Sequence, residues 1–182
     1  GRNIAAGDTL PTGTGGNVNI GATVAPAMRR MPSNPAILRM VKGLYWHRLT
    51  EASGAQFLND EWKVAPEADR MGYRFRGGKA LEFVDREQPF GAGSDPSNIV
   101  DGCYSYGSIQ VPGGTEPIVL HRDAVSGGGY FTLGAIISAD MDFIGQLQPH
   151  TPVKFEAVSM DAALSARKER HKLLDTIRAE LS

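Results

Sequence analysis

The 182-residue sequence contains a single cysteine, few aromatic residues and almost no net charge. One thiol excludes a disulfide scaffold and leaves no cysteine pair for a zinc knuckle. Nineteen basic against twenty acidic residues give a formal net charge of −1, so no overall field favours nucleic acid. The four histidines are scattered without metal-ligand spacing, and we predict no metal site.

Long hydrophobic runs are missing as well. The longest apolar stretches, such as residues 134–139, fall far short of the roughly 18 residues that a membrane span needs. The first residues lack the apolar centre of a signal peptide. We therefore expect a reduced, cytoplasmic protein that binds neither membrane nor nucleic acid. Because the sequence starts without methionine, we expect it to begin inside a longer natural chain.

Glycine and proline are abundant instead, at 22 and 11 residues, and 41% of the chain is hydrophobic, enough for a core. Thr50 is predicted to cap a short helix, Asp140 to cap one or two helical turns up to residue 147, and Ser159 to cap a long, charged, solvated helix. Residues 88–98 are a predicted loop. Apolar patterning predicts strands at 36–41, 62–64, 71–75, 108–111, 117–121, 133–138 and 153–158, with a further short strand considered at 17–20. Many short strands with one terminal helix indicate a mainly β barrel or sandwich.

The segment 69–74 places two arginines in one predicted strand. Because side chains alternate along a strand, Arg70 and Arg74 would share one face, with Met71 and Tyr73 on the other. Two guanidinium groups on one face could hold a carboxylate or a bicarbonate-like anion in bidentate fashion. The alternative is an exposed strand face with ordinary ion pairs.

Gln110 lies between two β-branched residues, just before a Pro-Gly-Gly turn at 112–114. A side-chain amide both donates and accepts hydrogen bonds. Gln110 is therefore a candidate to bind a urea-like or lactam substrate. The alternative is a plain hairpin in which the turn alone explains the pattern.

Three consecutive glycines, Gly127, Gly128 and Gly129, precede Tyr130. Glycines let a backbone approach a ligand closely and can present N–H groups to an anion. The run matches neither a P-loop nor a dinucleotide fingerprint, so we predict a shaped ligand-contact loop, with a flexible loop as the alternative. Cys103 has no histidine near it in the sequence, and we expect a small buried residue rather than a nucleophile.

Taken in order, these segments resemble the family of allophanate hydrolase subunit 2, also described as biotin-dependent carboxyltransferase or as a subunit of 5-oxoprolinase. The family pattern D-R-M-G-Y-R-L-x-G is similar to residues 69–77, with Phe75 in place of leucine. Its S-E-G-x-x-x-G-x-I-Q-V-P is echoed at 100–112, and its P-I-x-L-x-x-D-x-Q-T-T-G-G-Y-P at 117–131. The resemblance covers about residues 36–165, with the motifs in the family's order.

The resemblance implies a mainly β fold, a cyclophilin-like β-barrel over residues 36–159 followed by a C-terminal helix at 160–182. Residues 1–35 would be the loop-rich trailing part of a preceding barrel and a linker, since residues 1–10 resemble a segment found mid-chain in the family. The chain would then correspond to the C-terminal half or more of the family subunit.

The resemblance also implies a subunit of a multi-subunit carboxyltransferase or amidohydrolase complex that acts on a urea-, amide- or lactam-type substrate. The expected partner resembles allophanate hydrolase subunit 1, in a hetero-oligomer. The expected cofactor is carboxybiotin on a carrier domain, or ATP bound by partner subunits, with none attached covalently to this chain. The implied catalytic residues, which hold or orient the reacting groups or accept a proton, are Asp123, Gln110 and Asp101. The implied substrate-binding residues are Arg70, Tyr73, Arg74, Gly127, Gly128, Gly129 and Tyr130.

The ligand-contact segment departs from the family pattern, which leaves the substrate open. Val125, Ser126 and Gly127 stand where the family has Q-T-T, Phe131 replaces a proline, and Asp101 replaces a glutamate. The alternative function is a non-catalytic regulatory subunit that binds a partner barrel resembling a histidine-kinase inhibitor. A third function, peptidyl-prolyl isomerisation, would rest on analogy with the barrel alone.

Overall fold

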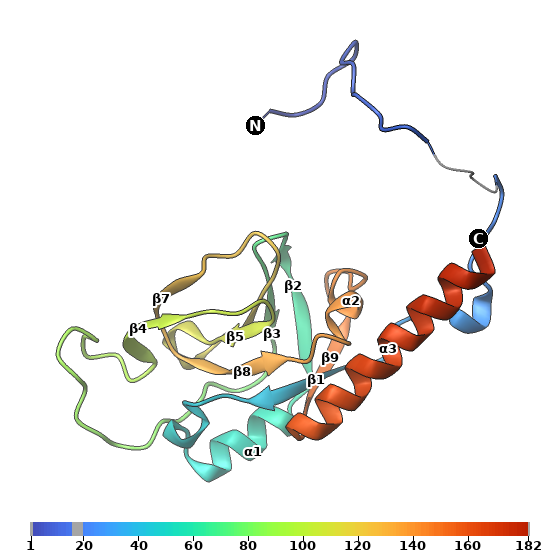
Figure 1. Ribbon diagram of the computed structural model, residues 1–182. Helices are drawn as coiled ribbons and strands as arrows, with labels where there is room; N and C mark the ends of the chain where they lie inside the picture. Colours follow the sequence, from blue (N-terminus) through green and yellow to red (C-terminus); the bar gives the residue numbers. More distant parts are fainter. Residues whose placement is uncertain (1, 16–19, 182) are drawn as a thin grey trace.

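Seven strands close into a barrel in the computed structural model, which describes residues 2–15 and 20–181 (Figure 1). The barrel strands are β1 (Ala36–Lys42), β2 (Trp62–Ala68), β3 (Gly72–Arg76), β5 (Ser108–Gln110), β6 (Ile118–Leu120), β8 (Thr132–Ile136) and β9 (Pro152–Ala157). Their order around the barrel is β1-β8-β5-β6-β3-β2-β9, and parallel pairing of β1 with β9 closes it. Each predicted strand between residues 36 and 158 overlaps one of these, so the mainly β barrel is confirmed. The strand considered at 17–20 falls almost wholly outside the described residues.

Two further strands, β4 (Asn98–Cys103) and β7 (Gly127–Tyr130), pair as a separate antiparallel sheet. The sequence predicts neither, and the loop predicted for the three glycines is wrong. Glycine has a low strand propensity, but its missing side chain here lets two backbones approach closely. A Cβ on Gly129 would lie 3.1 Å from the Ile99 carbonyl oxygen, and one on Gly102 would lie 2.9 Å from the Ile99 side chain.

The helices are α1 (Glu51–Asn59), α2 (Met141–Ile144) and α3 (Met160–Leu181), with 3-10 helices at Pro26–Met28, Trp46–Arg48 and Pro112–Gly114. Two predicted caps are confirmed. The Thr50 hydroxyl accepts a hydrogen bond from the Ser53 N–H at 3.1 Å, at the start of α1. The Ser159 hydroxyl accepts one from the Ala162 N–H at 3.2 Å, at the start of α3. Both side chains satisfy a backbone donor that the first helical turn leaves free.

The predicted cap at Asp140 is wrong. The Asp140 carboxylate makes no cap hydrogen bond and instead accepts hydrogen bonds from the Arg39 backbone N–H at 3.0 Å, Nε at 2.9 Å and Nη2 at 2.6 Å. The carboxylate is completely buried, and this ion pair joins β1 to the start of α2. A buried carboxylate is tolerated here because three donors satisfy it.

An aromatic cluster fills the barrel. Phe57 of α1 stacks on Phe155 of β9 with ring centroids 4.9 Å apart, and Trp62 and Phe75 pack against this pair. These four rings are at most 2% exposed. Burying each ring contributes on the order of 2–3 kcal/mol, so α1 is held to the barrel mainly by Phe57.

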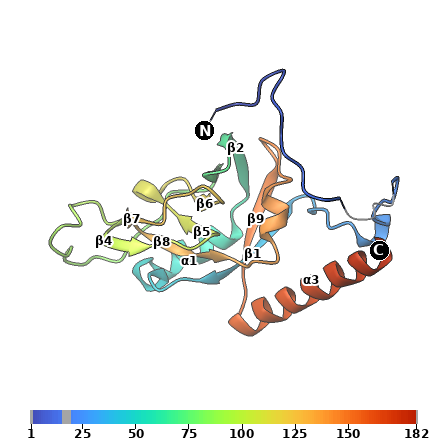
Figure 2. The ribbon, with the colours of Figure 1, turned by 45° about the horizontal axis from the view of Figure 1, so that its top comes forward.

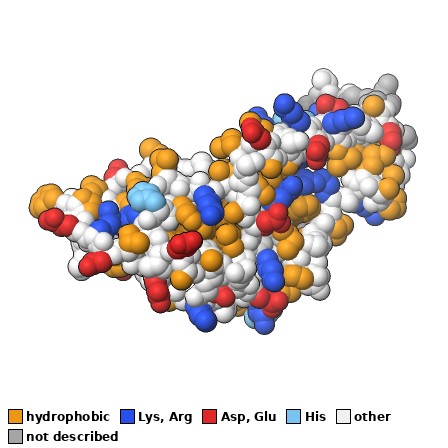
Figure 3. Space-filling view, turned by 90° about the horizontal axis from the view of Figure 1, so that it is seen from below, with side chains coloured by type: hydrophobic (Ala, Val, Ile, Leu, Met, Phe, Trp, Pro, Cys, Tyr) orange, Lys and Arg blue, Asp and Glu red, His pale blue; other side chains and the backbone are white. Residues whose placement is uncertain are grey.

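The helix α3 runs along the outside of β1 and projects past the barrel (Figures 1 and 2). Only Ala166 of α3 is buried, which confirms the predicted solvated helix. Basic and acidic side chains alternate over this end of the molecule (Figure 3). Among the described residues, no helix combines the length and the apolar character needed to cross a membrane.

The described part of residues 1–35 carries the 3-10 helix Pro26–Met28 and extends away from the barrel (Figure 1). Arg30 anchors the end of this segment, since its Nη1 donates to the Ala139 carbonyl oxygen at 2.7 Å. The origin of this segment in a preceding barrel stays a prediction. The division of the chain into segments 1–35, 36–159 and 160–182 also stays a prediction.

The Thr50 cap gives a direct test of the local folding of α1. We expect Thr50→Ala to lower the free energy of unfolding by about 1 kcal/mol and the melting temperature by about 2–4 °C, because the Ser53 N–H loses its acceptor. Thr50→Ser keeps the hydroxyl and should retain most of the stability. Urea and thermal denaturation measure both variants, and an equal loss in Thr50→Ser would contradict the capping role.

Candidate functional site

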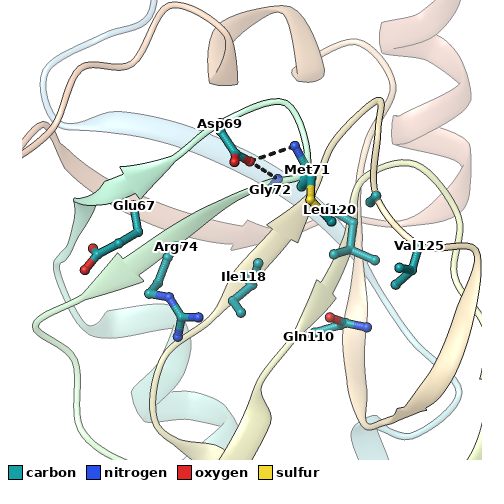
Figure 4. Close-up of a pocket in the computed structure, with 10 residues that line it drawn as sticks. Glu67, Asp69, Met71, Gly72, Arg74, Gln110, Ile118, Leu120 and Val125 are labelled. Carbon is teal, nitrogen blue, oxygen red and sulfur yellow. Dashed lines mark hydrogen bonds between the residues drawn. The ribbon is translucent and has the colours of Figure 1, made fainter. Parts of the chain in front are cut away.

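A pocket of about 290 Å³ opens on the outer face of the neighbouring strands β3, β5 and β6 (Figure 4). Ile118 of β6 pairs with Arg74 on one side and with Gln110 on the other, so these three side chains lie next to one another. Val119, the next residue along β6, is completely buried in the core. The pocket is lined by Glu67, Asp69, Met71, Gly72, Arg74, Gln110, Ile118, Leu120, Ala124 and Val125.

Gln110 is the most constrained polar group in the pocket. It is 6% exposed, and its Nε2 is buried with no hydrogen-bond partner among the described residues. Leaving a buried donor unpaired costs about 1–3 kcal/mol, which a ligand with a carbonyl or carboxylate oxygen would recover. Gln110 therefore lines the pocket with an amide whose donor has no partner among the described residues, and rotation about its last side-chain bond would present this donor to an oxygen in the pocket.

The hydroxyl of Tyr104 lies near Gln110 but is already hydrogen-bonded to the backbone of Tyr130. It accepts from the Tyr130 backbone N–H at 2.7 Å and donates to the Tyr130 carbonyl oxygen at 3.0 Å. Burial raises the pKa of the Tyr104 hydroxyl, while the hydrogen bond from the Tyr130 backbone N–H, and then the Gln110 side chain, lower it to a smaller extent. Tyr104 is thus a neutral support that fixes β7 behind Gln110.

Arg74 supplies the positive charge of the pocket. Its Nη1 donates to the Glu116 carboxylate at 3.0 Å, and Glu116 also accepts from Arg76 Nε at 2.8 Å. The Arg74 side chain is 35% exposed, so part of the guanidinium remains accessible. This bridge orients Arg74 along the strand and leaves further N–H groups for a ligand.

Glu67 places a carboxylate at the edge of the pocket. Its own backbone N–H lowers the pKa of the Glu67 carboxyl, and the Arg76 guanidinium lowers it further, against an opposing effect of desolvation. Glu67 is therefore ionised at neutral pH. The other rim carboxylate, Asp69, accepts from the Met71 and Gly72 backbone N–H groups at 2.8 and 3.3 Å, which holds the turn before β3 (Figure 4).

The rest of the pocket is apolar. Met71, Ile118, Leu120 and Val125 contribute hydrocarbon surface between the polar ends. A side chain at Gly72 would lie 3.0 Å from Ile118 and fill part of this space. The pocket can therefore bind a small molecule that carries a carbonyl oxygen together with an apolar portion.

The predicted pairing of Arg70 with Arg74 on one face is wrong. The turn held by Asp69 ends at the start of β3, so Arg70 lies outside the strand and Met71, not Arg70, lines the pocket. Arg70 instead forms an exposed ion pair with Asp123, with 2.8 Å between Nη2 and Oδ2. Two residues predicted to act on substrate are thus bound to each other beside the pocket.

The remaining predicted residues also lie outside the pocket. Tyr73 packs on the core side of β3, with its ring centroid 5.8 Å from that of His121. Asp101 is exposed on β4, where its carboxylate accepts from the Gly102 N–H at 2.9 Å. The predicted buried position of Cys103 is wrong, because this free thiol is exposed.

The glycines and Tyr130 form β7 rather than a ligand loop. Gly127 pairs with Cys103, and Gly128 with Gly102, so the segment is part of a sheet. A Cβ on Gly128 would lie 3.3 Å from the Tyr104 ring, which gives this glycine a packing role. Across the described residues, there is no group of three or more histidine, cysteine or acidic side chains suited to hold a metal ion.

The sequence predicts Arg74 and Gln110 as site residues but not the apolar side chains that line the pocket between them. The missing signal is the strand pairing: Gly72 pairs with Leu120, and Arg74 with Ile118, although each pair is widely separated in the sequence. The alternation within β6 indicates that Ile118 and Leu120 share a face. The register that places this face beside Arg74 is not visible in the alternation alone.

Comparison with known proteins identifies the family of the chain and structures that share its fold. Residues 1–157 match the model of a family described as carboxyltransferase domain, subdomain A and B. The chain belongs to this family. A 5-oxoprolinase subunit of Haemophilus influenzae is 30% identical over 178 residues, or 98% of this carboxyltransferase-domain chain and 52% of the relative. The protein of the same name from Escherichia coli is 30% identical over 140 residues, or 77% of the chain and 42% of the relative.

Among solved structures, urea amidolyase of K. lactis superimposes with a TM-score of 0.71 and 29% identity, over 78% of this carboxyltransferase-domain chain and 8% of the larger protein. The chain spans about half the length, or less, of the curated relatives named above. These relatives are a subunit of an enzyme named for 5-oxoproline and an enzyme named for urea.

Proposed function

We propose that this chain is a subunit of an enzyme complex that acts on a lactam- or urea-type amide. In this proposal, the pocket on β3, β5 and β6 binds the carbonyl end of the substrate. The single observation that carries the proposal is the buried Gln110 Nε2, which lacks a partner among the described residues and lines a pocket with Arg74. The names of the 5-oxoprolinase and urea amidolyase relatives support the substrate class.

Within the pocket, each group has a distinct role in the proposal. Gln110 donates a hydrogen bond to the substrate carbonyl oxygen and polarises it. Arg74 binds a carboxylate, either on the substrate or on the group transferred to it. Glu67, rather than Asp123 or Asp101, is the carboxylate placed to accept a proton, because it lines the pocket and they do not.

The apolar wall favours a lactam over urea. Met71, Leu120 and Val125 offer hydrocarbon surface, and a lactam has ring carbons that can be buried against it, whereas urea has none. Val125 stands where the family pattern has glutamine, which makes this side of the pocket less polar. We therefore propose a lactam as the better substrate.

The cofactor is also part of the proposal. Carboxybiotin supplies an activated carboxyl group when it is bound, and Gln110 and Arg74 are suitable donors for its oxygens. The alternative cofactor, ATP, would be bound by partner subunits. The proposed partner resembles allophanate hydrolase subunit 1, in a cytoplasmic hetero-oligomer, since a free exposed thiol such as Cys103 suits a reducing compartment.

The proposed function is tested by turnover in the assembled complex. The full-length protein is purified with its partner subunits, and ATP-dependent opening of 5-oxoproline and carboxylation of urea are measured side by side. Faster turnover of 5-oxoproline supports the lactam assignment. Turnover of neither compound, with partner binding intact, would contradict the enzyme role and favour the regulatory alternative.

The arginine in the pocket has a matched control on the same strand. We expect Arg74→Gln to raise KM about 10-fold in the assembled complex, because a charge-assisted hydrogen bond to substrate is lost. Arg76→Gln also removes a hydrogen bond to Glu116 but lies outside the pocket, so its KM should change less than about 2-fold; because Arg76 also pairs with Glu67 at 3.1 Å, only KM, and not kcat, is compared between the two variants. Equal effects in the two variants would show that the Glu116 bridge, not a substrate contact, is responsible.

A further inference from the structure

A second hollow of about 190 Å³ lies next to the candidate pocket, and the two share Ala124 and Val125 as a common wall. The second hollow lies between the residues that follow β4 and the segment that precedes β7. Its polar lining consists of Tyr104, Ser105, Tyr106, His121, Arg122 and Ser126. The lining holds no carboxylate, in contrast to the first pocket.

Arg122 is a positioned cation in this hollow. Its guanidinium lies over the Tyr106 ring, 4.4 Å from the centroid, which restricts its position. Among the described residues, no carboxylate lies within ion-pair distance of Arg122, although most other arginines near the barrel are paired. The nearest acidic neighbour in the chain, Asp123, is bound to Arg70 at 2.8 Å. The Arg122 charge is therefore available to a ligand.

His121 is held beside Arg122 by aromatic packing. Its ring centroid lies 5.8 Å from that of Tyr73 and 5.4 Å from that of Tyr106, the latter in an edge-to-face arrangement. Its Nδ1 is buried and has no hydrogen-bond partner in the described part of the chain. Because Nδ1 is buried, a ligand in the hollow would meet the imidazole at its other ring nitrogen, Nε2.

Hydroxyl groups complete the lining. Ser105 shares a hydrogen bond with Ser108 at 3.1 Å between their Oγ atoms, which orients it, and Ser126 contributes a second hydroxyl. The Tyr104 hydroxyl is used by the Tyr130 backbone and is not available. The hollow thus offers a guanidinium, an imidazole and hydroxyls without a competing carboxylate.

We infer that this hollow is a binding site for a small oxyanion, with Arg122 as the charged anchor and His121 and Ser126 as hydrogen-bonding partners. The geometry suits a carboxylate, bicarbonate or phosphate, whose oxygens accept hydrogen bonds from these groups. The site stands on its own contacts and does not rest on the function proposed for the neighbouring pocket. Its position across the wall formed by Ala124 and Val125 would bring the anion close to a molecule bound at Gln110.

The charge state of His121 provides a specific readout. Burial, and then the charge of Arg122, lower the pKa of His121, while Asp123 opposes this effect and Arg70 adds slightly to it. The rings of Tyr73 and Tyr106 cover its faces. The imidazole is therefore neutral at neutral pH. A bound anion favours the protonated form, so it should raise the His121 pKa.

The test is a titration of the 182-residue chain with inorganic phosphate and, separately, with acetate and bicarbonate, followed by the NMR signals of the His121 ring at constant ionic strength. We expect a saturable shift with a dissociation constant on the order of 1 mM, and a His121 pKa that rises on binding. Tighter binding of phosphate identifies a phosphate site, and tighter binding of a carboxylate or bicarbonate identifies a carboxylate site. Either result supports the proposal.

Arg122→Gln should weaken this binding at least about 10-fold, whereas Arg167→Gln, which removes an exposed arginine of α3, should leave it unchanged. His121→Gln should remove the pH dependence of acetate binding near neutral pH without abolishing binding, since acetate itself does not titrate there. The absence of saturation with every anion, or equal weakening by Arg122→Gln and Arg167→Gln, would overturn the proposal. Amide spectra of each variant verify the fold, and Arg122 is exposed, so its replacement should not disturb the core.

Discussion

Replacement of Gln110 by leucine should lower kcat/KM of the assembled complex about 100-fold while leaving the chain at least as stable as before. The loss of activity follows because a positioned donor to a developing charge contributes a factor of roughly 10² to 10³ in rate. The stability is kept because leucine removes a buried donor that has no partner among the described residues. Removal of an unsatisfied buried polar group is neutral or stabilising.

The matched control for this variant is Gln148→Leu, at an exposed glutamine outside the pocket. Activity and thermal denaturation should both be unchanged there. Partner binding by Gln110→Leu, measured by co-purification, should also be unchanged. A Gln110→Leu chain that unfolds at a lower temperature, or that retains full turnover, would contradict the role assigned to this amide.

The largest loss of stability is expected at Asp140. We predict that Asp140→Asn lowers the free energy of unfolding by about 3 kcal/mol, or the melting temperature by about 10 °C, because the half-buried Arg39 loses the charged partner that holds it. Asp142→Asn removes a carboxylate that is 41% exposed and pairs with Arg170, and should cost no more than about 1 kcal/mol.

A double-mutant cycle separates the ion pair from its surroundings. If Asp140 acts through Arg39, then Asp140→Asn combined with Arg39→Met should be less destabilising than the sum of the single changes. Chemical denaturation of the four chains measures the coupling free energy. Additive losses would show that the buried carboxylate acts through other contacts, such as its approach to Arg30 at 3.9 Å.

The barrel strands could be predicted from the sequence because apolar side chains alternate along them. The segment that became β9 is an example, with Val153 and Phe155 buried at every second position. The strand β7 could not be predicted in this way. Its glycines carry no side chains to show a pattern, and it is held by close backbone pairing with β4.

The site was predictable in part for similar reasons. Gln110 is visible in the sequence as a polar residue among β-branched ones, but its lack of a partner depends on the tertiary packing around β5. The position of Arg70 depends on a turn, since the two hydrogen bonds accepted by the Asp69 carboxylate end the turn before β3. A strand extended by two residues would have placed Arg70 on the same face of the sheet as Arg74.

The hydrogen bonds of Asp140 also depend on tertiary contacts that the local sequence does not show. An aspartate just before a short helical segment is typical of an N-cap. In the folded protein, however, three donors of Arg39, 101 residues away in the sequence, satisfy this carboxylate instead. Local patterns identify the residue as an acceptor, and tertiary packing decides which donors it meets.

The central claim, that the Gln110 amide binds the substrate carbonyl, is tested most directly by its own NMR signal. The side-chain amide of Gln110 is observed in ¹⁵N-glutamine-labelled protein, assigned by its loss in Gln110→Leu, and titrated with 5-oxoproline and with urea. We predict a saturable shift of the Gln110 amide with 5-oxoproline, a weaker one with urea, and none at Gln148. A Gln110 signal that stays unchanged while either compound is turned over by the assembled complex would contradict the account.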